Sequence, residues 1–259
     1  MSFFVQRGDV FDATELTRGP WSPDHQHGGP PGALLVGRLA AAHQDRVVVR
    51  ASIEFLRPVP IAPLRVELEP SSGGRRVLRA RGRLVEASGA VLCVAQVLLV
   101  RSAPVAHPLL STESDDPPLH PGAAAGAAET FGFFRWETGY HTAMELRFTR
   151  GHFGAGPVRV WMRQRVPLVE GETTAPIERV LCAVDSVHGV SWRIDPREMN
   201  AVNADLVVAL HRLPEGDWIC LDAMTANEPA GIGVAQSRLW DGRGPLGWSL
   251  QSLVLAPVS

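Results

Sequence analysis

An internal repeat is the feature that most constrains the fold of this chain. Residues 50–100 align with residues 205–255 at a constant shift of 155 positions and without gaps. Seven aligned positions are identical, and one of them pairs Gln96 with Gln251. The expected strands, turns and apolar faces stay in phase along the two copies. Because self-similarity at a fixed period marks a duplicated structural unit, we expect one β-rich unit used twice.

Most of the repeated sequence has the two-residue period of strands with one solvated face. Alternation of this kind runs through residues 47–55, 64–68 and 78–84. The later segments 91–100 and 246–255 are mostly apolar, which is typical of central strands. Turn sequences at residues 86–89 and 241–244 stand directly before these two segments. The order of alternating strand, turn and apolar strand predicts a hairpin in each copy.

Helix signals are few, and one precedes each copy of the repeat. The run Gly28-Gly29-Pro30-Pro31-Gly32 precedes an apolar stretch over residues 33–42. Proline in the first helical turn costs no useful hydrogen-bond donor, so a helix is expected to begin here. The stretch is apolar nearly all round, which predicts a helix buried against a sheet. Before the second copy, threonines and Pro176 precede a helical pattern over residues 177–187.

Composition and charge exclude several classes of function. The formal net charge of −2 and the isoelectric point near 6.5 give no reason to expect nucleic acid as a partner. No stretch approaches the roughly 18 apolar residues of a membrane span. Residues 1–7 lack the basic and then apolar layout of a signal peptide, so we expect a cytoplasmic protein.

The three cysteines, Cys93, Cys182 and Cys220, are scattered within apolar segments and cannot all pair. Buried thiols in a reducing compartment are the expected state. None of the three is near a plausible base in the sequence, which disfavours a cysteine nucleophile.

Three segments of the chain form a recognisable set of motifs. The first is the run His-Gly-Gly-Pro-Pro-Gly-Ala-Leu at residues 27–34, and the second is Phe-Leu-Arg-Pro at residues 55–58. The third is a C-terminal set: Asn203-Ala204-Asp205, residues 218–225, and Leu250-Gln251-Ser252. Together these segments resemble the type II acyl-CoA thioesterases. The resemblance implies an α+β double hotdog, in which two tandem antiparallel sheets each wrap round a long central helix. It implies an N-terminal hotdog over residues 1–104, a linker over 105–128 and a C-terminal hotdog over 129–259.

The resemblance also implies a function and a site. The family hydrolyses fatty or related acyl thioesters carried by coenzyme A or an acyl carrier protein, without a cofactor. An aspartate, a hydroxyl residue and a glutamine of the second hotdog hold the attacking water. Matched residue by residue, these fall at Asp205, Thr225 and Gln251. Hotdog sheets commonly pair edge to edge, so a homodimer or higher homo-oligomer is expected.

Asp205 begins an apolar strand, where partial desolvation would raise its basicity. Gln251 offers a donor and an acceptor, and Thr225 offers an adaptable hydroxyl. In the first copy Asp205 falls on Arg50 and Thr225 falls on Pro70. Only the second copy therefore carries a base, which predicts one active site per chain.

The first half of the chain is expected to supply the hydrogen-bond donors for the oxyanion. Backbone N–H groups at Gly28, Gly29 and Gly32 begin a helix, where negative charge is favoured. His27 is expected at the pocket entrance. His27 and Pro30 stand where better-known members of the family have an aromatic residue and a glutamine, so pocket shape and substrate are expected to differ from theirs.

Other interpretations remain open at this point. Asp24-His25-Gln26-His27 has too few ligands at suitable spacing to predict a metal site. Asp185-Ser186-Val187-His188 is similar to a fragment of a catalytic triad but lacks the Gly-x-Ser-x-Gly elbow, and a solvated helix end explains it. Asp205 could instead cap a strand, and Gln251 could be a satisfied core amide. At the level of the whole chain, a non-catalytic acyl-thioester binder and a hotdog hydratase or dehydratase are the alternatives to a hydrolase.

Overall fold

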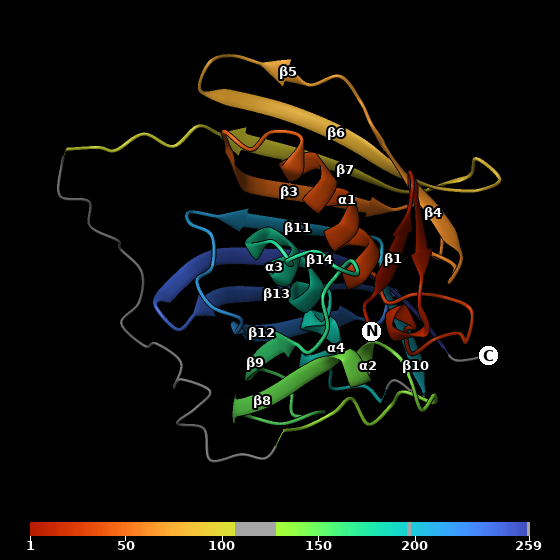
Figure 1. The fold of residues 1–259 in the computed structure, drawn as a ribbon. Coiled ribbons are helices and arrows are strands. Elements are labelled where there is room, and N and C mark those ends of the chain that lie inside the picture. The colour runs from red at the N-terminus through yellow and green to blue at the C-terminus, as the bar shows by residue number, and fades with distance from the viewer. Residues whose placement is uncertain (107–127, 196–197, 258–259) are drawn as a thin grey trace.

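The structure is a computed structural model that describes residues 1–106, 128–195 and 198–257 (Figure 1). The expected linker, residues 105–128, lies almost wholly outside the described residues. The strands are β1 (Phe4–Arg7), β2 (Val10–Ala13), β3 (Val47–Phe55), β4 (Pro63–Leu68), β5 (Ser72–Gly73), β6 (Val77–Glu86), β7 (Val91–Val100), β8 (Met144–Arg150), β9 (Val158–Gln164), β10 (Met199–Asn203), β11 (Asp205–Leu210), β12 (Ile219–Glu228), β13 (Ile232–Asp241) and β14 (Gly244–Pro257). The helices are α1 (Gly29–Ala41), α2 (Tyr140–Ala143), α3 (Pro176–Val184) and α4 (Val187–Ser191), with a 3-10 turn at Glu15–Thr17. None of the helices among the described residues is long and apolar enough to cross a membrane.

The strands form one large sheet in which the ladders between named strands are antiparallel. The order is β1-β2-β4-β6-β7-β3-β11-β14-β13-β12-β9-β8, with β5 paired to β6 and β10 paired to β14. Around the β3–β11 seam the order β4-β6-β7-β3 is mirrored by β11-β14-β13-β12. Figure 1 shows α1 in front of the first half of this sheet and α3 in front of the second half. The duplication predicted from the sequence is therefore visible in the strand order.

Strand bounds and strand pairing test the predicted shift of 155 positions. The strand β13 has the bounds of β6 moved by that shift, and every position that is buried in β6 is also buried in β13. The last strand departs from the shift, because Ala80 pairs with Val97 whereas its counterpart Ala235 pairs with Gln251. Gln251 is thus the structural counterpart of Val97, one position away from the alignment. The expected equivalence of Gln96 and Gln251 is wrong at the level of structure, since Gln96 lies on the opposite face of its strand.

The helix α1 is almost completely buried, as its sequence predicts, and Pro30 and Pro31 lie in its first turn. The helix expected over residues 177–187 is divided in two. The first part, α3, ends at Val184, and α4 begins at Val187. Both parts keep an apolar buried face, so the helical pattern of the sequence gave no sign of the break between α3 and α4. Asp185 and Ser186 lie at this junction, within the protein interior.

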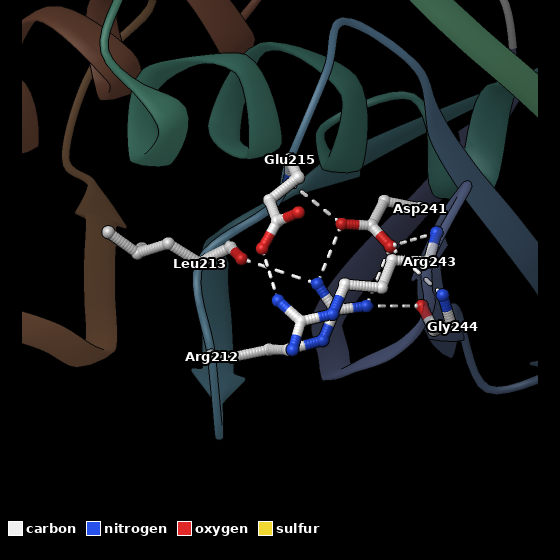
Figure 2. A network of polar contacts seen from close by, with 6 residues as sticks. All are labelled: Arg212, Leu213, Glu215, Asp241, Arg243 and Gly244. Carbon is white, nitrogen blue, oxygen red and sulfur yellow. Dashed lines mark hydrogen bonds and ion pairs between the residues drawn. The ribbon is translucent and has the colours of Figure 1, made fainter. Parts of the chain in front are cut away.

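The predicted turn at residues 241–244 joins β13 to β14 and is fixed by a buried ion pair (Figure 2). Both terminal nitrogens of Arg212 donate to Asp241, at 2.7 and 2.6 Å. Asp241 also accepts hydrogen bonds from the backbone N–H groups of Glu215, Arg243 and Gly244. Burial favours the protonated carboxyl, but these donors outweigh it and hold the pKa of Asp241 below its usual value. The network ties the hairpin to the end of β11 and so fixes the register of β14.

Candidate active site

A buried carboxylate lies where the two halves of the molecule meet. Asp185 follows the last residue of α3, and its side chain is 4% exposed. Its Oδ2 lies 2.9 Å from Nδ1 of His27, and its Oδ1 accepts a hydrogen bond of 2.8 Å from Nδ2 of Asn203. Gly29, in the first turn of α1, donates its backbone N–H to the same carboxylate. One acidic side chain of the second half is thus bound by two groups from the start of α1.

The donors around Asp185 decide its charge. Burial by itself raises the pKa of Asp185, since it disfavours the charged form. The electrostatic interaction with His27 and the hydrogen bonds from His27, Asn203 and Gly29 outweigh burial and bring the pKa of Asp185 below its usual value. Asp185 is therefore an ionised carboxylate at neutral pH.

His27 is held on two sides. Its ring stacks on the ring of Tyr140, with centroids 3.7 Å apart and planes inclined by 2°. Its Nδ1 lies close to both Asp185 Oδ2 and the Gly29 nitrogen, at 2.9 and 3.2 Å. Because one ring nitrogen cannot donate and accept at once, and the ionised carboxylate is the stronger acceptor, we assign the proton to Nδ1. The Tyr140 hydroxyl donates to the backbone oxygen of Cys182 at 2.6 Å and lies 2.8 Å from Ser186 Oγ, which fixes the platform under His27.

Two glycines permit this close approach. A Cβ atom at Gly28 would lie 3.0 Å from both carboxylate oxygens of Asp185, and one at Gly29 would lie 2.7 Å from the backbone oxygen of Cys182. Larger residues at these positions would push α1 away from the end of α3. The steric account of the glycine run is therefore supported at Gly28 and Gly29.

A pocket of about 390 Å³ opens beside Asp185 and His27. Its wall is rich in aromatic side chains: Trp21, Phe55, Phe131, Phe133 and Phe134. Residues of the Phe-Leu-Arg-Pro segment form another part of the lining. The polar groups are few, which is the usual composition of a site for an apolar ligand with one reactive group.

The structure does not bring Asp205 to this pocket. Asp205 pairs with Glu54 across the β3–β11 seam, and residues directly opposite in an antiparallel pair project to the same face. Glu54 is exposed, whereas the next pair along, Leu206 and Ile53, is buried against the helices. Asp205 Oδ1 accepts a hydrogen bond of 2.7 Å from the backbone N–H of Ser252. The expectation that Asp205 faces the glycine run across an apolar slot is wrong, because the pleat of β11 turns it to the outer face of the sheet.

Gln251 and Thr225 project to the inner face and contact the segment that carries Asp185. Gln251 is 1% exposed, and its Nε2 donates to the backbone oxygen of Asp185 at 3.2 Å. Thr225 Oγ1 lies 2.7 Å from Ser191 Oγ, at the end of α4. Gln251 therefore lies at the α3–α4 junction, where the carboxylate is Asp185, whereas Thr225 lies at the far end of α4.

The expected oxyanion donors are partly occupied within the protein. The Gly29 N–H is directed to Asp185, and the Gly32 N–H donates to the Gly28 backbone oxygen at 3.0 Å as part of the helix. Gly28 lines the pocket, so of the three glycines it is the one beside the space for a ligand.

Asp185 was the residue that sequence reasoning missed. Its segment was set aside as a solvated helix end, yet the residues before and after it, over 177–190, are largely apolar. A charged residue within a buried helical pattern is a signal of a paired or functional group, because burying an unpaired charge is costly. Asn203 was quoted as part of the C-terminal motif, and it is this residue, two positions before Asp205, that contacts the site.

The cysteines contribute no nucleophile here. Cys93, Cys182 and Cys220 are free and buried, as predicted, and burial raises the pKa of each thiol. Within the described part of the chain, no group of three or more histidine, cysteine or acidic residues is arranged to hold a metal ion.

Comparisons with known proteins agree with this arrangement of two halves. The family model described as acyl-CoA thioesterase N-terminal domain matches residues 17–102, and the one described as acyl-CoA thioesterase C-terminal domain matches residues 114–255. The chain belongs to the acyl-CoA thioesterase family and is a thioester hydrolase. A search of curated proteins found no match.

Several solved structures share the fold at low sequence identity. A candidate thioesterase II from Thermobifida fusca is 20% identical, with a TM-score of 0.75 over 98% of this chain and 95% of that one. A hot dog fold protein of unknown function from Alicyclobacillus acidocaldarius is 15% identical, with a TM-score of 0.71 over 99% and 96%. The acyl-CoA thioesterase II TesB2 from Mycobacterium marinum is 15% identical, with a TM-score of 0.62 over 98% and 94%. These similarities establish a hotdog-type fold.

Proposed function

We propose that this protein hydrolyses an acyl-CoA thioester to the free acid and the thiol by direct attack of water. The observation that carries the proposal is the ionised carboxylate of Asp185, held beside His27 at the wall of an apolar pocket. The acidic residue of the water-activating group is Asp185 in place of Asp205. Gln251 completes this group by holding the main chain at Asp185, and Thr225 holds the end of α4, the helix that follows it.

Direct attack fits the groups available. Water is a weak nucleophile, so hydrolysis needs a proton acceptor and a donor for the oxygen that becomes negative. The Asp185–His27 pair supplies the acceptor, and the Gly28 N–H at the start of α1 is the proposed oxyanion donor. No serine or cysteine with a base beside it faces the pocket among the described lining residues, so a covalent acyl-enzyme is not part of the proposal.

The pocket suggests how the substrate lies. The acyl chain would lie against the aromatic wall, and the thioester would lie at Asp185. Arg57 lines the pocket and is exposed, so it is the proposed contact for a phosphate of coenzyme A.

The architecture that fits this site is a double hotdog. We propose that residues 1–104 and 129–259 are the two units, joined by a linker over residues 105–128. The mirrored strand order and the contact of α1 with α3 support the assignment. A single site then forms between the units, because the carboxylate comes from one and the glycine-rich helix start from the other.

Release of free thiol from a panel of acyl-CoAs of increasing chain length tests the proposal. Wild type should hydrolyse at least one member, and Asp185→Asn should lower kcat on the order of 10³-fold, the scale for loss of an orienting or basic carboxylate. Asp205→Asn is the matched control, since it removes a carboxylate of the same unit that lies on the outer face. Equal loss in both variants, or binding of acyl-CoA by wild type without thiol release, would contradict the proposal.

A further inference from the structure

We propose that the imidazole of His27 is the catalytic base and then the acid of this hydrolysis, and that Asp185 positions it. The inference rests on the proposed function and deepens it by naming the group that carries the proton. Its central observation is the contact of His27 Nδ1 with Asp185 Oδ2 at 2.9 Å, at the pocket wall.

Asp185 is poorly arranged to accept a proton from water itself. Its carboxylate already receives hydrogen bonds from His27, Asn203 and Gly29, which engage both oxygens. Each donor favours the charged carboxylate and weakens it as a base. A carboxylate that is buried and fully hydrogen-bonded in this way is suited to orient and stabilise an imidazole.

His27 has the complementary arrangement. Its Nδ1–H points to Asp185, which assigns the lone pair of the neutral ring to Nε2. None of the described residues forms a hydrogen bond with Nε2, and His27 belongs to the pocket lining. The ring is therefore held by one nitrogen and free to react at the other.

The stack on Tyr140 restricts the ring further. Parallel planes at 3.7 Å prevent the imidazole from turning about its long axis, and the Tyr140 hydroxyl is itself fixed by Cys182 and Ser186. Orientation by a carboxylate and by packing is what a general base needs, because a misplaced base loses much of its effect.

The proposed steps conserve atoms and charge. Water forms a bond from its oxygen to the thioester carbonyl carbon while His27 Nε2 takes one of its protons. The carbonyl oxygen becomes negative and is stabilised by the helix start. When the oxyanion returns its electron pair, the carbon–sulfur bond breaks, and the proton on Nε2 passes to the sulfur. The products are the carboxylic acid and the thiol, and His27 is neutral again.

The titratable groups around His27 allow its protonation to be followed. Burial raises the pKa values of Tyr140, Cys93 and Cys182, and burial lowers the pKa of His188 to about 4. Asp185 stays ionised because its pKa lies below the usual value, and His25 and His188 are the other histidines of the lining. Substitutions at His27 and His25 therefore distinguish which of the two gives the rate its pH dependence.

The substitution His27→Asn distinguishes the roles of the two ring nitrogens. The asparagine amide can still donate to Asp185 from the position of Nδ1, but it has no counterpart of Nε2. We expect kcat for acyl-CoA hydrolysis to fall by about 10²–10⁴-fold, the usual contribution of a general base. We expect KM to change little, and we expect the rise of kcat/KM with pH that a neutral imidazole base requires to disappear. His27→Phe keeps the stacked ring without either nitrogen, and it should lose the same pH dependence.

Three comparisons complete the experiment. His25→Gln should keep the rise of kcat/KM with pH. His43→Gln, which lies outside the pocket, should keep both the value of kcat and the rise of kcat/KM with pH. Asp185→Asn should have a low kcat but should keep the rise of kcat/KM with pH, because the imidazole of His27 remains. If folded His27→Asn or His27→Phe, checked by circular dichroism, keeps the rate within a few-fold and the rise with pH, the inference is overturned while the hydrolase assignment stands. If wild type hydrolyses no thioester, it is the proposed function that fails.

Discussion

Gln251 donates its side-chain amide to the backbone oxygen of Asp185 across 3.2 Å, and so joins the inner face of β14 to the junction between α3 and α4. The backbone oxygen it satisfies is buried with Asp185, and the structural counterpart of Gln251 in the first half is the apolar Val97. The amide is thus specific to the half that carries the carboxylate. Its contact explains how a strand residue outside the pocket lining contributes to the site.

The substitution Gln251→Met keeps the volume of the side chain and removes the donor. Leaving a buried carbonyl unsatisfied costs about 1–3 kcal/mol, so we expect a lower melting temperature. We also expect kcat/KM for acyl-CoA hydrolysis to fall about tenfold or more, since the main chain at Asp185 is released. Thermal unfolding and steady-state kinetics measure the two effects. Gln96→Met, on the outer face, is the control and should be close to wild type in both; a matching loss there would argue against a specific role for Gln251.

Gly28→Ala tests the close approach of α1 to the carboxylate. Gly28 has an ordinary helical φ of −66°, so the backbone accepts alanine, and the effect comes from the new methyl group. That methyl group would lie 3.0 Å from both oxygens of Asp185 and from Phe55 Cζ. We expect at least a tenfold loss of kcat, measured by thiol release. Gly132→Ala, where no atom lies within 4 Å of the new Cβ, should change neither activity nor stability beyond about 0.5 kcal/mol.

The strands and the first helix could be predicted from periodicity, because the repeat, the strand alternation and the proline-glycine start of α1 are local signals, whereas the hotdog topology came from the family resemblance. Their bounds depend on residues close in sequence, and the structure agrees with them. The one-residue offset of β14 could not be found in this way, since it arises at the turn, where Trp240 pairs with Pro245 but its counterpart Val85 pairs with Val91. An alignment without gaps hides an offset of this kind.

The site was only partly predictable for a related reason. Gln251 was identified by resemblance and lies at the α3–α4 junction, and Thr225 contacts the end of α4. The resemblance placed the carboxylate at Asp205, whereas the carboxylate beside the pocket is Asp185. Assigning a strand residue to one face needs the register of the seam between β3 and β11, which is a long-range property. The pairing of Asp185 with His27 joins residues far apart in the chain, and no sequence spacing predicts it.

A substitution at Gly189 tests where the acyl chain lies. Gly189 is in α4 and lines the pocket, and a Cβ atom there would lie 3.7 Å from both Phe131 and Phe133. Gly189→Leu should fill this part of the pocket and shift preference toward shorter acyl chains. Because each methylene is worth about 0.8 kcal/mol, the ratio of kcat/KM between long and short acyl-CoAs should fall by roughly tenfold or more. Gly189→Ala should shift the ratio less. An unchanged ratio in Gly189→Leu would place the chain elsewhere.

Glu178, in the first turn of α3, gives the stability of the protein a pH dependence. It faces α1 at Gly37, and its Oε2 accepts a hydrogen bond of 2.7 Å from the Ala175 N–H. Burial is the main cause that raises its pKa from 4.5 to about 7, against the opposing effects of the Ala175 N–H and Arg38. The folded protein therefore binds a proton more tightly than the unfolded chain. The stabilising contribution of that proton is fully present below pH 4.5 and is lost as pH rises through 7.

The substitution Glu178→Gln should remove this dependence while keeping an oxygen for the Ala175 N–H. Near pH 4.5 the variant and wild type should have similar free energies of unfolding. By pH 8 the variant should be the more stable, by about 3 kcal/mol at most. Urea unfolding at several pH values measures the difference. Glu172→Gln, which removes a more exposed carboxylate paired with Arg38, should leave the pH dependence in place. A difference between Glu178→Gln and wild type that stays constant from pH 4.5 to 8 would show that Glu178 is ionised in the folded protein throughout this range.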